Sequence, residues 1–557
     1  MPSKRLILSL ENCADIEIAD LDVLKLPIRA FLTRYYALIN NLLKSKILYR
    51  KDMRPQGEVL VTRLSLLLPF IHQNKDLRIG KDAEDSICSW NEVDPDGQQF
   101  TKLLNYVHFC NYMPEVHRDY YIVHSNENQL LLDHKSQNFA DSEAKDIILS
   151  ELALLSPKVQ TGAIDQRIIA LATSSPVLNI ELLAELLVER EAVLLSSFDD
   201  PMLISEKNIP VVFKLDSDSV RRIQRTIMSL AQLLEDLSTA LAMLHQKDPE
   251  NPNFLKEFYE WSAVAWSKEF FFQLISKTAK VPLPKLEHYL SLYAINCTST
   301  GQFNQGGDGY FPPFAIFDDL ILFSPHVVLS YLHLRNALYE FSKRQPKKFD
   351  KIVSHDLEPS LLQHAEARLP QTSNWLIAKN VNLSTTEIDF LIFDPQSLQL
   401  LIIEAKGPLP PQGARSTARL GERMKEGLRQ LAKLQELDSD FWRQLVTAKF
   451  KIECDKVEHR LGLLSRSCFG CSEAYDEHGF HRLTLPLLQL ATNSLPAHAN
   501  SLFDYLDHLS TVEAEIYQNA KIDWRSDTLE ICGTEVSVPT LHFDQHFIEQ
   551  KRSEALK

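Results

Sequence analysis

The sequence lacks the features that mark membrane and exported proteins. No window approaches the roughly 18 unbroken apolar residues that a membrane-spanning helix needs, and the stretch LSLLLPFI near Leu64 is far too short. The N-terminal apolar stretch is broken by acidic residues before the core of a signal peptide is complete, at Glu11, Asp15, Glu17 and Asp20. We therefore expect a cytoplasmic protein with no membrane partner.

The sequence also lacks a disulfide framework and an overall positive charge. Its eight cysteines are dispersed through 557 residues, which predicts reduced thiols that mostly pack in cores. A formal net charge of -15 argues against a surface coated in nucleic acid, because binding to phosphates relies on Lys and Arg. A local basic patch remains compatible with that charge. No repeat period and no low-complexity tract is present.

The length and composition predict a multidomain α/β protein. A chain of 557 residues and 63.8 kDa exceeds one hydrophobic core, and 45% hydrophobic with 24% charged residues is typical of globular proteins. We expect a mixed N-terminal region of unknown role, a helical domain, an α/β domain and a mixed C-terminal extension, over residues 1–140, 141–300, 315–485 and 486–557 respectively.

The helical domain is predicted from apolar residues at helical spacing. One stripe, in SVRRIQRTIMSLAQLLEDLSTALAML, contains Ile223, Ile227, Leu230, Leu234, Leu237 and Leu241. We interpret this stripe as core, and a groove for a partner is the alternative. Residues 298–314, rich in Gly, Asn and Pro, predict a domain boundary. A phosphate-binding loop is the alternative there, although the Lys and Ser/Thr of a Walker motif are missing.

A later region is typical of a β-hairpin. Two apolar runs, EIDFLIFD and LQLLIIEAK, flank a turn at 395–398. With a four-residue loop, Asp394 faces Gln399, and the antiparallel register then places Asp389 directly opposite Glu404. Two carboxylates therefore meet across the predicted strand pair.

Lys406 joins these two acids because side chains two apart on a strand share a face. It projects on the same side as Glu404, while Ile403 and Ala405 turn toward the opposite layer. Opposed carboxylates at the end of a hydrophobic hairpin are unfavourable unless a cation compensates them. Mg²⁺ prefers one or two carboxylates, completed by water and substrate phosphate, and we expect Mn²⁺ to substitute for it. The pattern predicts a magnesium site.

Such a site favours hydrolysis of a phosphodiester bond. A metal ion lowers the pKa of a bound water and neutralises charge on the phosphate, while Lys406 would position the attacking hydroxide or stabilise the transition state. The alternative is a hairpin whose surface acids form an exposed ion pair with Lys406, worth at most about 1 kcal/mol.

These residues resemble a known family. T-E-I-D, followed after a hairpin by I-I-E-A-K-G, is similar to the core of the PD-(D/E)XK nuclease superfamily, which includes restriction-type endonucleases; the resemblance covers roughly residues 345–465. It implies a restriction-endonuclease-like αβββαβ core and Mg²⁺-dependent cleavage of DNA, with Asp389, Glu404 and Lys406 as catalytic residues and both acids as metal ligands. A bacterial restriction or phage-defence role is a hypothesis, as is a homodimer or a regulatory partner bound through the N-terminal helical region.

The family also places a helix before the sheet, often with a glutamate that joins the metal site. Here that helix would be HDLEPSLLQHAEARL. The resemblance assigns Glu358 as this catalytic and metal-binding residue, with Glu366 as the second choice. Pro359 is compatible if Asp356 or Leu357 begins the helix, because the first turn has no internal amide bonds to lose.

The sequence departs from the family pattern at two points. Ile388 stands where the family motif has proline, a residue that is often absent in the superfamily. Gln430 is followed by Leu434 in place of the tyrosine of the QxxxY element, which argues against a RecB-type exonuclease. Gln430 is retained as an auxiliary residue.

A basic amphipathic helix is predicted after the hairpin. An apolar side contains Leu420, Met424, Leu428, Leu431 and Leu434. The other side is basic, and we assign nucleic-acid binding to Arg415, Arg419, Arg423 and Arg429. A solvated helix surface is the alternative. Residues 459–467 predict a further strand, which completes the order αβββαβ.

Other functions remain open on the residues alone. Cys468 and Cys471 have CxxC spacing and are followed by His478 and His481, which is a weak pattern for zinc. The chain could instead be a catalytically silent scaffold that binds nucleic acid or protein. An RNA-directed phosphodiesterase is a further alternative, because nothing in the residues distinguishes ribose from deoxyribose.

Overall fold

The protein, seen in a computed structural model, divides into two compact units. Unit 1 contains Met1–Tyr112, Ser156–Phe349 and Glu530–Gly533, and unit 2 contains Met113–Leu155, Asp350–Leu529 and Thr534–Lys557. The structure describes residues 2–43, 60, 64, 66–67, 70–71, 93–126, 129–153, 164–174, 179–194, 203–251, 262–297, 312–371, 373–383, 387–411, 413–470, 473–476, 479–497 and 499–555.

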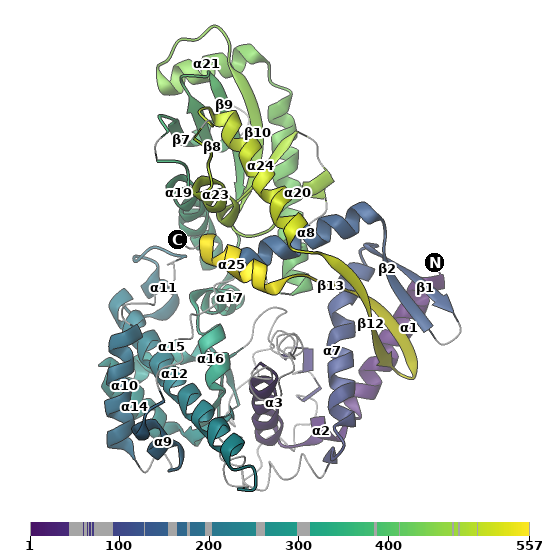
Figure 1. The fold of residues 1–557 in the computed structure, drawn as a ribbon, viewed down its shortest axis with the longest axis vertical. Coiled ribbons are helices and arrows are strands. Elements are labelled where there is room, and N and C mark those ends of the chain that lie inside the picture. Colours follow the sequence, from purple (N-terminus) through teal and green to yellow (C-terminus); the bar gives the residue numbers. More distant parts are fainter. Residues whose placement is uncertain are drawn as a thin grey trace. The chain divides into compact units, whose positions relative to one another are not determined.

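Unit 1 consists mainly of helices with one four-stranded sheet (Figure 1). The sheet has the order β3-β6-β5-β4, in which β6 pairs antiparallel with β3 and β5, while β4 pairs parallel with β5. The strands are β3 (Val264–Ser267), β4 (Ala294–Asn296), β5 (Phe314–Ile316) and β6 (Leu320–Phe323). The helices are α1 (Pro2–Ala19), α2 (Asp22–Lys25), α3 (Ile28–Leu43), α9 (Gln166–Ala172), α10 (Ile180–Leu194), α11 (Ile209–Phe213), α12 (Ser217–Lys247), α14 (Lys268–Ala279), α15 (Leu283–Ser291), α16 (Pro325–Tyr331) and α17 (Leu334–Arg344); α7 (Gln98–Val116) and α18 (Pro346–Ile352) begin in it.

The long helix α12 carries the predicted core stripe. The prediction is confirmed, since every stripe residue is buried: Ile223, Ile227, Leu230, Leu234, Leu237 and Leu241. The helix begins where the Asp216 carboxylate accepts the Ser219 N–H at 2.8 Å, which satisfies one of the free donors of the first turn. Within the described ranges, α12 is the helix whose length and composition would suffice to cross a membrane, and 83% of that apolar window is buried inside the protein.

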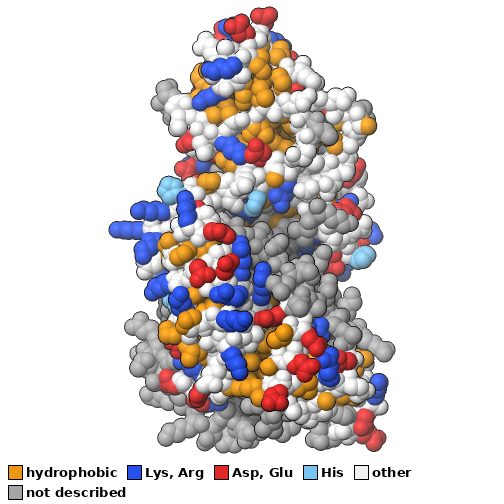
Figure 2. Space-filling model, turned by 90° about the vertical axis from the view of Figure 1, so that its left-hand side faces the viewer, with side chains coloured by type: hydrophobic (Ala, Val, Ile, Leu, Met, Phe, Trp, Pro, Cys, Tyr) orange, Lys and Arg blue, Asp and Glu red, His pale blue; other side chains and the backbone are white. Residues whose placement is uncertain are grey.

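The surface carries charges of both signs. Figure 2 shows one face, on which Lys and Arg side chains are interspersed with Asp and Glu. Among the described side chains on this face, no patch of one sign covers the whole surface. The net charge of -15 is therefore compatible with local groups of basic side chains.

The five-stranded sheet of unit 2 contains the predicted hairpin. Its order is β11-β10-β9-β8-β7; β7, β8 and β9 pair antiparallel, and β10 and β11 continue the sheet in parallel. Along the chain the order is helix, three strands, two helices, strand, short helix and strand. Helix α21 is therefore inserted before the predicted last strand, and α22 (Glu473–Asp476) and β11 follow that strand. These elements are α19 (Glu358–Ala367), β7 (Leu376–Asn382), β8 (Glu387–Asp394), β9 (Gln399–Lys406), α20 (Ala414–Gln435), α21 (Ser439–Phe450), β10 (Glu458–Ser465) and β11 (Phe480–Thr484).

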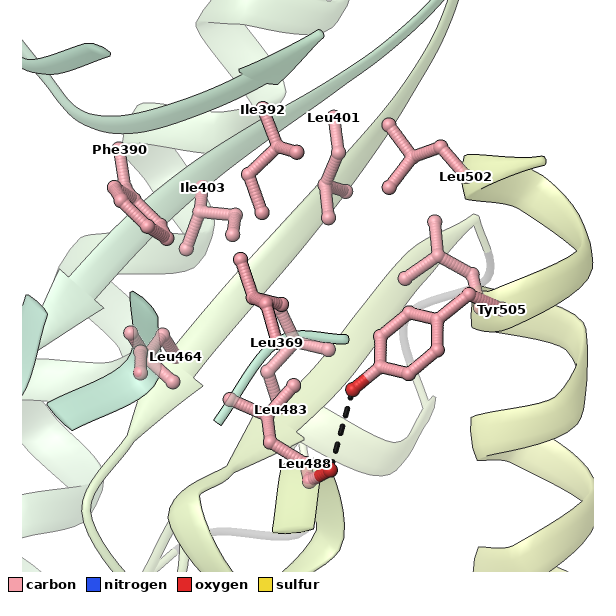
Figure 3. A pocket seen from close by; sticks show the side chains of 12 residues that line it. Leu369, Phe390, Ile392, Leu401, Ile403, Leu464, Leu483, Leu488, Leu502 and Tyr505 are labelled. Atoms are coloured by element: carbon pink, nitrogen blue, oxygen red, sulfur yellow. Dashed lines mark hydrogen bonds between the residues drawn. The ribbon is translucent and has the colours of Figure 1, made fainter. Parts of the chain in front are cut away.

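Alternation of apolar side chains places helices on both faces of this sheet. On one face, Leu391, Ile402 and Leu463 pack with the apolar side of α20, and every predicted residue of that side is buried. On the other face, Phe390 and Ile403 pack against α19, α23 (Leu485–Asn493) and α24 (Leu502–Asn519). Figure 3 shows a small apolar cavity in this second layer, where the Tyr505 hydroxyl donates to the Leu488 carbonyl at 3.2 Å. Ile403 and Ala405 lie in this opposite layer, as predicted.

A second sheet and several helices complete unit 2. The sheet has the order β1-β2-β13-β12. Helix α8 packs into the main core through Ile148, Leu149 and Leu152, and α25 contributes Ile548 and Ala555. These elements are β1 (Tyr121–Asn126), β2 (Gln129–His134), α8 (Gln137–Ala153), α22 (Glu473–Asp476), β12 (Asp523–Ile531), β13 (Thr534–His542) and α25 (Gln545–Ala555).

The compact units depart from the predicted domain boundaries. The boundary expected at 298–314 falls inside unit 1, because β4 before it and β5 after it are neighbouring strands of one sheet; residues 298–311 themselves lie outside the described residues. The expected extension 486–557 contains α24, which covers one face of the sheet of unit 2. The structure is mixed α/β, which is compatible with the predicted multidomain α/β class, and both units combine distant parts of the chain.

Candidate active site

The hairpin has the predicted register. Asp394 pairs with Gln399 at the turn, and pairing continues to Phe390 and Ile403. Asp389 and Glu404 occupy the next position of the same register, at the end of the paired segment. The period-two pattern and the short loop determine this arrangement locally.

Strand pairing is interrupted at Asp389 on the β7 side and ends before Asp389 on the β9 side. On the β7 side, Lys379 pairs with Phe390 and Val381 with Ile388, and the position between them, Asn380 opposite Asp389, is unpaired. Asn380 has φ +53°, a left-handed conformation that interrupts an extended strand. The Asp389 carboxylate accepts the Ala405 N–H at 2.7 Å, so it bonds to the backbone of β9 at the point where the strand pair ends.

Lys406 lies between the acids of the hairpin and α20. Its ammonium donates to Glu404 Oε1 at 2.5 Å and to Gln430 Oε1 at 2.9 Å. The side chain of Glu404 is 3% exposed and that of Lys406 is 16% exposed, so the ion pair is largely removed from water. The surface ion pair considered as an alternative is therefore excluded by burial. Gln430, assigned as auxiliary, contacts the lysine directly.

Close packing of glycines brings the neighbouring helices to these residues. A Cβ atom on Gly427 of α20 would lie 3.4 Å from Glu404 Cγ and 3.4 Å from Lys406 Cε. A Cβ atom on Gly407, the residue after β9, would lie 3.2 Å from Glu358 Cα. The absence of side chains at both positions lets α20 and α19 approach the end of β9.

Glu358 begins α19 and is preceded by a π-helical turn, Val353–Leu357. The Glu358 N–H bonds to the Val353 carbonyl, and Pro359 has no N–H to donate. The condition stated for Pro359, a helix that begins at Asp356 or Leu357, is not met: α19 begins at Glu358, and the π-helical turn continues helical backbone upstream. The second-choice residue, Glu366, is partly exposed and pairs with Lys379.

The pKa values of the three carboxylates are raised together. Burial raises the pKa of Glu404 to about 7, the charges of Asp389 and Glu358 add to the rise, and Lys406 opposes it. Burial also raises the pKa of Asp389. For Glu358, burial and the charge of Asp389 raise the pKa, while Lys406 and Arg423 oppose the rise. The three acids therefore share one local electrostatic environment that has too little positive charge.

The fit of a metal ion to this arrangement can be assessed from its donors. Within the described ranges, no three His, Cys, Asp or Glu side chains are grouped closely enough to hold a metal together. Asp389 and Glu404 are nevertheless adjacent, and they provide the one or two carboxylates that Mg²⁺ takes when water and substrate phosphate complete its shell. Glu358 lies within electrostatic range of both acids. Asp389 and Glu404 match the donor chemistry that Mg²⁺ or Mn²⁺ prefers, whereas Glu358 does not complete a group of three ligands with them in this structure.

Helix α20 has the predicted basic side in part. Arg419, Arg423 and Arg429 are exposed, and the charge of Arg423 reaches Glu358. Arg415 belongs to α20, but its side chain lies outside the described residues. Among the assigned arginines whose side chains are described, Arg423 is therefore the one whose charge acts on a residue of the candidate site.

Some residues that hold the site had no recognisable signal in the sequence. Arg466 is buried and donates to the Leu357 carbonyl at 2.9 Å, just before Glu358. Asp146 of α8 accepts the N–H groups of Phe469 and Gly470 at 2.6 and 2.7 Å, and burial raises its pKa to about 6. Both connect segments far apart in sequence. Gly407, which follows E-A-K, was a sequence signal that could have indicated the close approach of α19 to the end of β9.

Two of the four residues of the weak zinc pattern, Cys468 and His481, lie within the described residues. Cys468 is buried, and burial raises the pKa of its thiol well above the usual value. Burial lowers the pKa of His481 to about 4. Cys471 and His478 lie outside the described residues. Cys468 therefore has the surroundings of a packing thiol.

Comparisons with known proteins give no match: no family model, no curated protein and no solved structure matches this chain.

Proposed function

We propose that the protein is a metal-dependent nuclease that hydrolyses DNA phosphodiester bonds at Asp389, Glu404 and Lys406. The observation that carries the proposal is the buried Glu404, which lies beside the half-buried Asp389 and Glu358 and is bonded to one cation, Lys406. Such a group is unfavourable as structure alone, and a divalent cation removes the imbalance. The resemblance to the PD-(D/E)XK superfamily and the helix–strand order of unit 2 support the same reading.

Each residue has a distinct role in the proposed reaction. Asp389 and Glu404 would hold Mg²⁺ or Mn²⁺, with Glu358 as a further ligand. When bound, the metal supplies a low-pKa water and neutralises charge on the phosphate. Lys406 orients the attacking water and stabilises the negative charge that develops on the phosphate oxygens. Gln430 holds the lysine ammonium in place by the bond at 2.9 Å.

The substrate is proposed from the basic helix and the resemblance. Arg419 and Arg423 on α20 would contact backbone phosphates, and Arg415 and Arg429 are included in the proposed surface. DNA is preferred over RNA because of the family resemblance. A bacterial restriction or phage-defence role, cytoplasmic location, and a homodimer or a regulatory partner of unit 1 remain parts of the proposal.

The decisive experiment compares wild type with Glu404→Ala on a panel of substrates. Linear, circular and single-stranded DNA and RNA are incubated with each protein in Mg²⁺, Mn²⁺ or EDTA, and matched thermal melts verify folding. We expect cleavage by wild type that needs metal and is absent in the variant. Cleavage of circular DNA would identify an endonuclease, and preferential cleavage of RNA would replace the proposed substrate.

A catalytically silent scaffold is the second candidate, because no three-residue metal group is preformed among the described residues. It predicts binding to nucleic acid without turnover. Arg423→Gln should then weaken binding and lower the salt dependence by about 0.9 in the log–log slope for each lost phosphate contact. Salt-dependent binding with no cleavage in either metal would favour the scaffold over the nuclease.

A further inference from the structure

The turn between β12 and β13 holds a cysteine in an unusual conformation. Cys532 and Gly533 are the two residues between the strands, and their φ values are +50° and +71°. Positive φ at both central positions is the pattern of a type I′ turn, which favours Asn, Asp or Gly at the first position. A cysteine at this position is strained relative to those residues.

Hydrogen bonds of unit 1 hold this turn against α1 and α7. The Cys532 N–H donates to Glu17 Oε2 at 3.2 Å, and the Lys102 ammonium donates to Glu17 Oε1 at 2.7 Å. Asn105 Nδ2 donates to the Glu530 carbonyl at 3.3 Å. All these residues belong to unit 1. The position of Cys532 is therefore determined by several contacts.

The side chain of Cys532 meets a second thiol. The Cys532 thiol lies within interaction range of the Cys13 thiol, and Cys13 precedes Glu17, the bonded partner of the Cys532 N–H, by one turn of α1. Cys13 is exposed and Cys532 is partly exposed, and both thiols are free. Burial raises the pKa of Cys532 to about 12, and its contacts with Cys13 and Glu17 add to the rise. Cys532 is therefore a neutral thiol near pH 7, beside an exposed thiol that an oxidant can reach.

We propose that Cys13 and Cys532 form a reversible dithiol–disulfide pair, a redox modification site that is independent of the proposed nuclease. With a peroxide as oxidant, the Cys13 sulfur attacks one peroxide oxygen, becomes a sulfenic acid and releases one water. The Cys532 sulfur then attacks the sulfenic sulfur, and the departing hydroxyl leaves as water with the Cys532 proton. The sum is two thiols and one hydrogen peroxide to one disulfide and two waters.

The disulfide would join α1 to the tip of a hairpin. The tip, Glu530–Gly533, is part of unit 1, whereas the rest of β12 and β13 belongs to unit 2. Oxidation therefore fixes the tip covalently to α1, while under reducing conditions the hydrogen bonds of Glu17 and Asn105 hold it. The disulfide should also raise the melting temperature, because it links positions far apart in the unfolded chain.

The experiment uses the full chain in hydrogen peroxide, followed by alkylation of the remaining thiols and digestion with trypsin under non-reducing conditions. The two cysteines fall in different peptides, residues 6–25 and 526–551, each with one cysteine. We expect a linked peptide pair that is two hydrogen atoms lighter than the free peptides together. Dithiothreitol should restore both free peptides and reverse the rise in melting temperature.

Variants make the result specific. Cys532→Asn keeps a residue suited to the turn, and Cys13→Ser changes an exposed position, so both proteins should fold. Each should lose the linked peptides and the oxidant-dependent rise in melting temperature, and Cys454→Ser, which removes a thiol of unit 2, should change neither. The proposal is overturned if both thiols stay alkylatable in peroxide, if either forms its disulfide with another cysteine, or if Cys13→Ser leaves the oxidation of Cys532 unchanged.

Discussion

The two units differ in how many cationic side chains compensate their acidic side chains. In unit 1, Asp236 pairs with Arg190, and Glu340 accepts from Arg344 at 2.9 Å with Lys343 at 3.8 Å. In unit 2, three carboxylates lie within electrostatic range of one another, and the bonded cation is Lys406 alone among the side chains described at the site. Buried acids that are paired with arginine are part of the packing, whereas neighbouring acids that share one lysine indicate a site for a further cation.

The largest expected effect is the loss of cleavage when the acids of the candidate site are replaced. Asp389→Ala and Glu404→Ala should reduce metal-dependent cleavage by at least about 1,000-fold, because both remove metal ligands, and Lys406→Ala should slow it by about 100-fold. Rates at saturating Mg²⁺, with matched thermal melts, measure this. Wild-type rates in all three variants would remove the proposed site.

Two matched controls sharpen that series. Glu366 lies on the same helix as Glu358 and pairs with Lys379 outside the site. Glu358→Ala should impair cleavage, whereas Glu366→Ala should leave its rate unchanged. Glu340→Gln in unit 1 should lower stability and leave the rate of the folded protein unchanged. If Glu366→Ala lost cleavage and Glu358→Ala kept it, Glu366 would replace Glu358 as the glutamate of the site.

The same comparison predicts stability changes of opposite sign. Asp236→Asn should lower the free energy of unfolding by about 2 to 4 kcal/mol, because Arg190 is left without its partner. Glu404→Gln in EDTA at pH 8 should raise it by roughly 1 to 3 kcal/mol, because a repelled and buried charge is removed. Urea unfolding of the two variants measures both. A loss of stability in Glu404→Gln would place this acid among the compensated ones.

The pH dependence follows from the raised pKa of Glu404. Between the unfolded value near 4.5 and the folded value of about 7, the folded protein holds a proton that the unfolded chain releases. The contribution of Glu404 to stability is therefore largest below pH 4.5 and is lost as pH rises toward 7. The difference in unfolding free energy between wild type and Glu404→Gln, measured in EDTA from pH 5 to 8, should shift steadily against wild type. Mg²⁺ should reverse this trend at the upper end.

A smaller effect compares glycines in the two units. A methyl group on Gly427 would lie 2.8 Å from Leu463 Cδ1, beside Glu404 and Lys406, so Gly427→Ala should lower cleavage by about 10-fold. Gly97 in unit 1 has open space and φ +68°, so Gly97→Ala should cost about 1 kcal/mol of stability without changing the rate. Rates and melts of both variants test this. Equal rates would show that α20 tolerates displacement from the site.

Short-range patterns account for the part of the site that could be predicted. The register of Asp389 and Glu404 followed from alternation and loop length, both within about 20 residues. The apolar side of α20 followed from helical spacing. The conformation of Asn380 and the turn before Glu358 could not be predicted, because nothing in their own neighbourhoods requires the observed backbone.

The compact units do not follow the domain boundaries that composition predicted. A Gly- and Pro-rich segment is typical of a linker, yet β4 and β5 on its two sides pair within one sheet. Composition cannot indicate such pairing, because it reports on the local chain and not on which strands meet. Helix α8 and the C-terminal helices likewise enter the core of unit 2 from distant positions.

The sequence by itself therefore determined the hairpin, its acidic pair with Lys406, and the amphipathic helix beside it, since their spacing sets which side chains share a face. The family resemblance named Glu358 and Gln430, but only the tertiary structure brings them to these residues and brings Cys13 near Cys532. These contacts join residues that are far apart in the sequence. They depend on how the helices and sheets pack together, and no local sequence pattern encodes that packing.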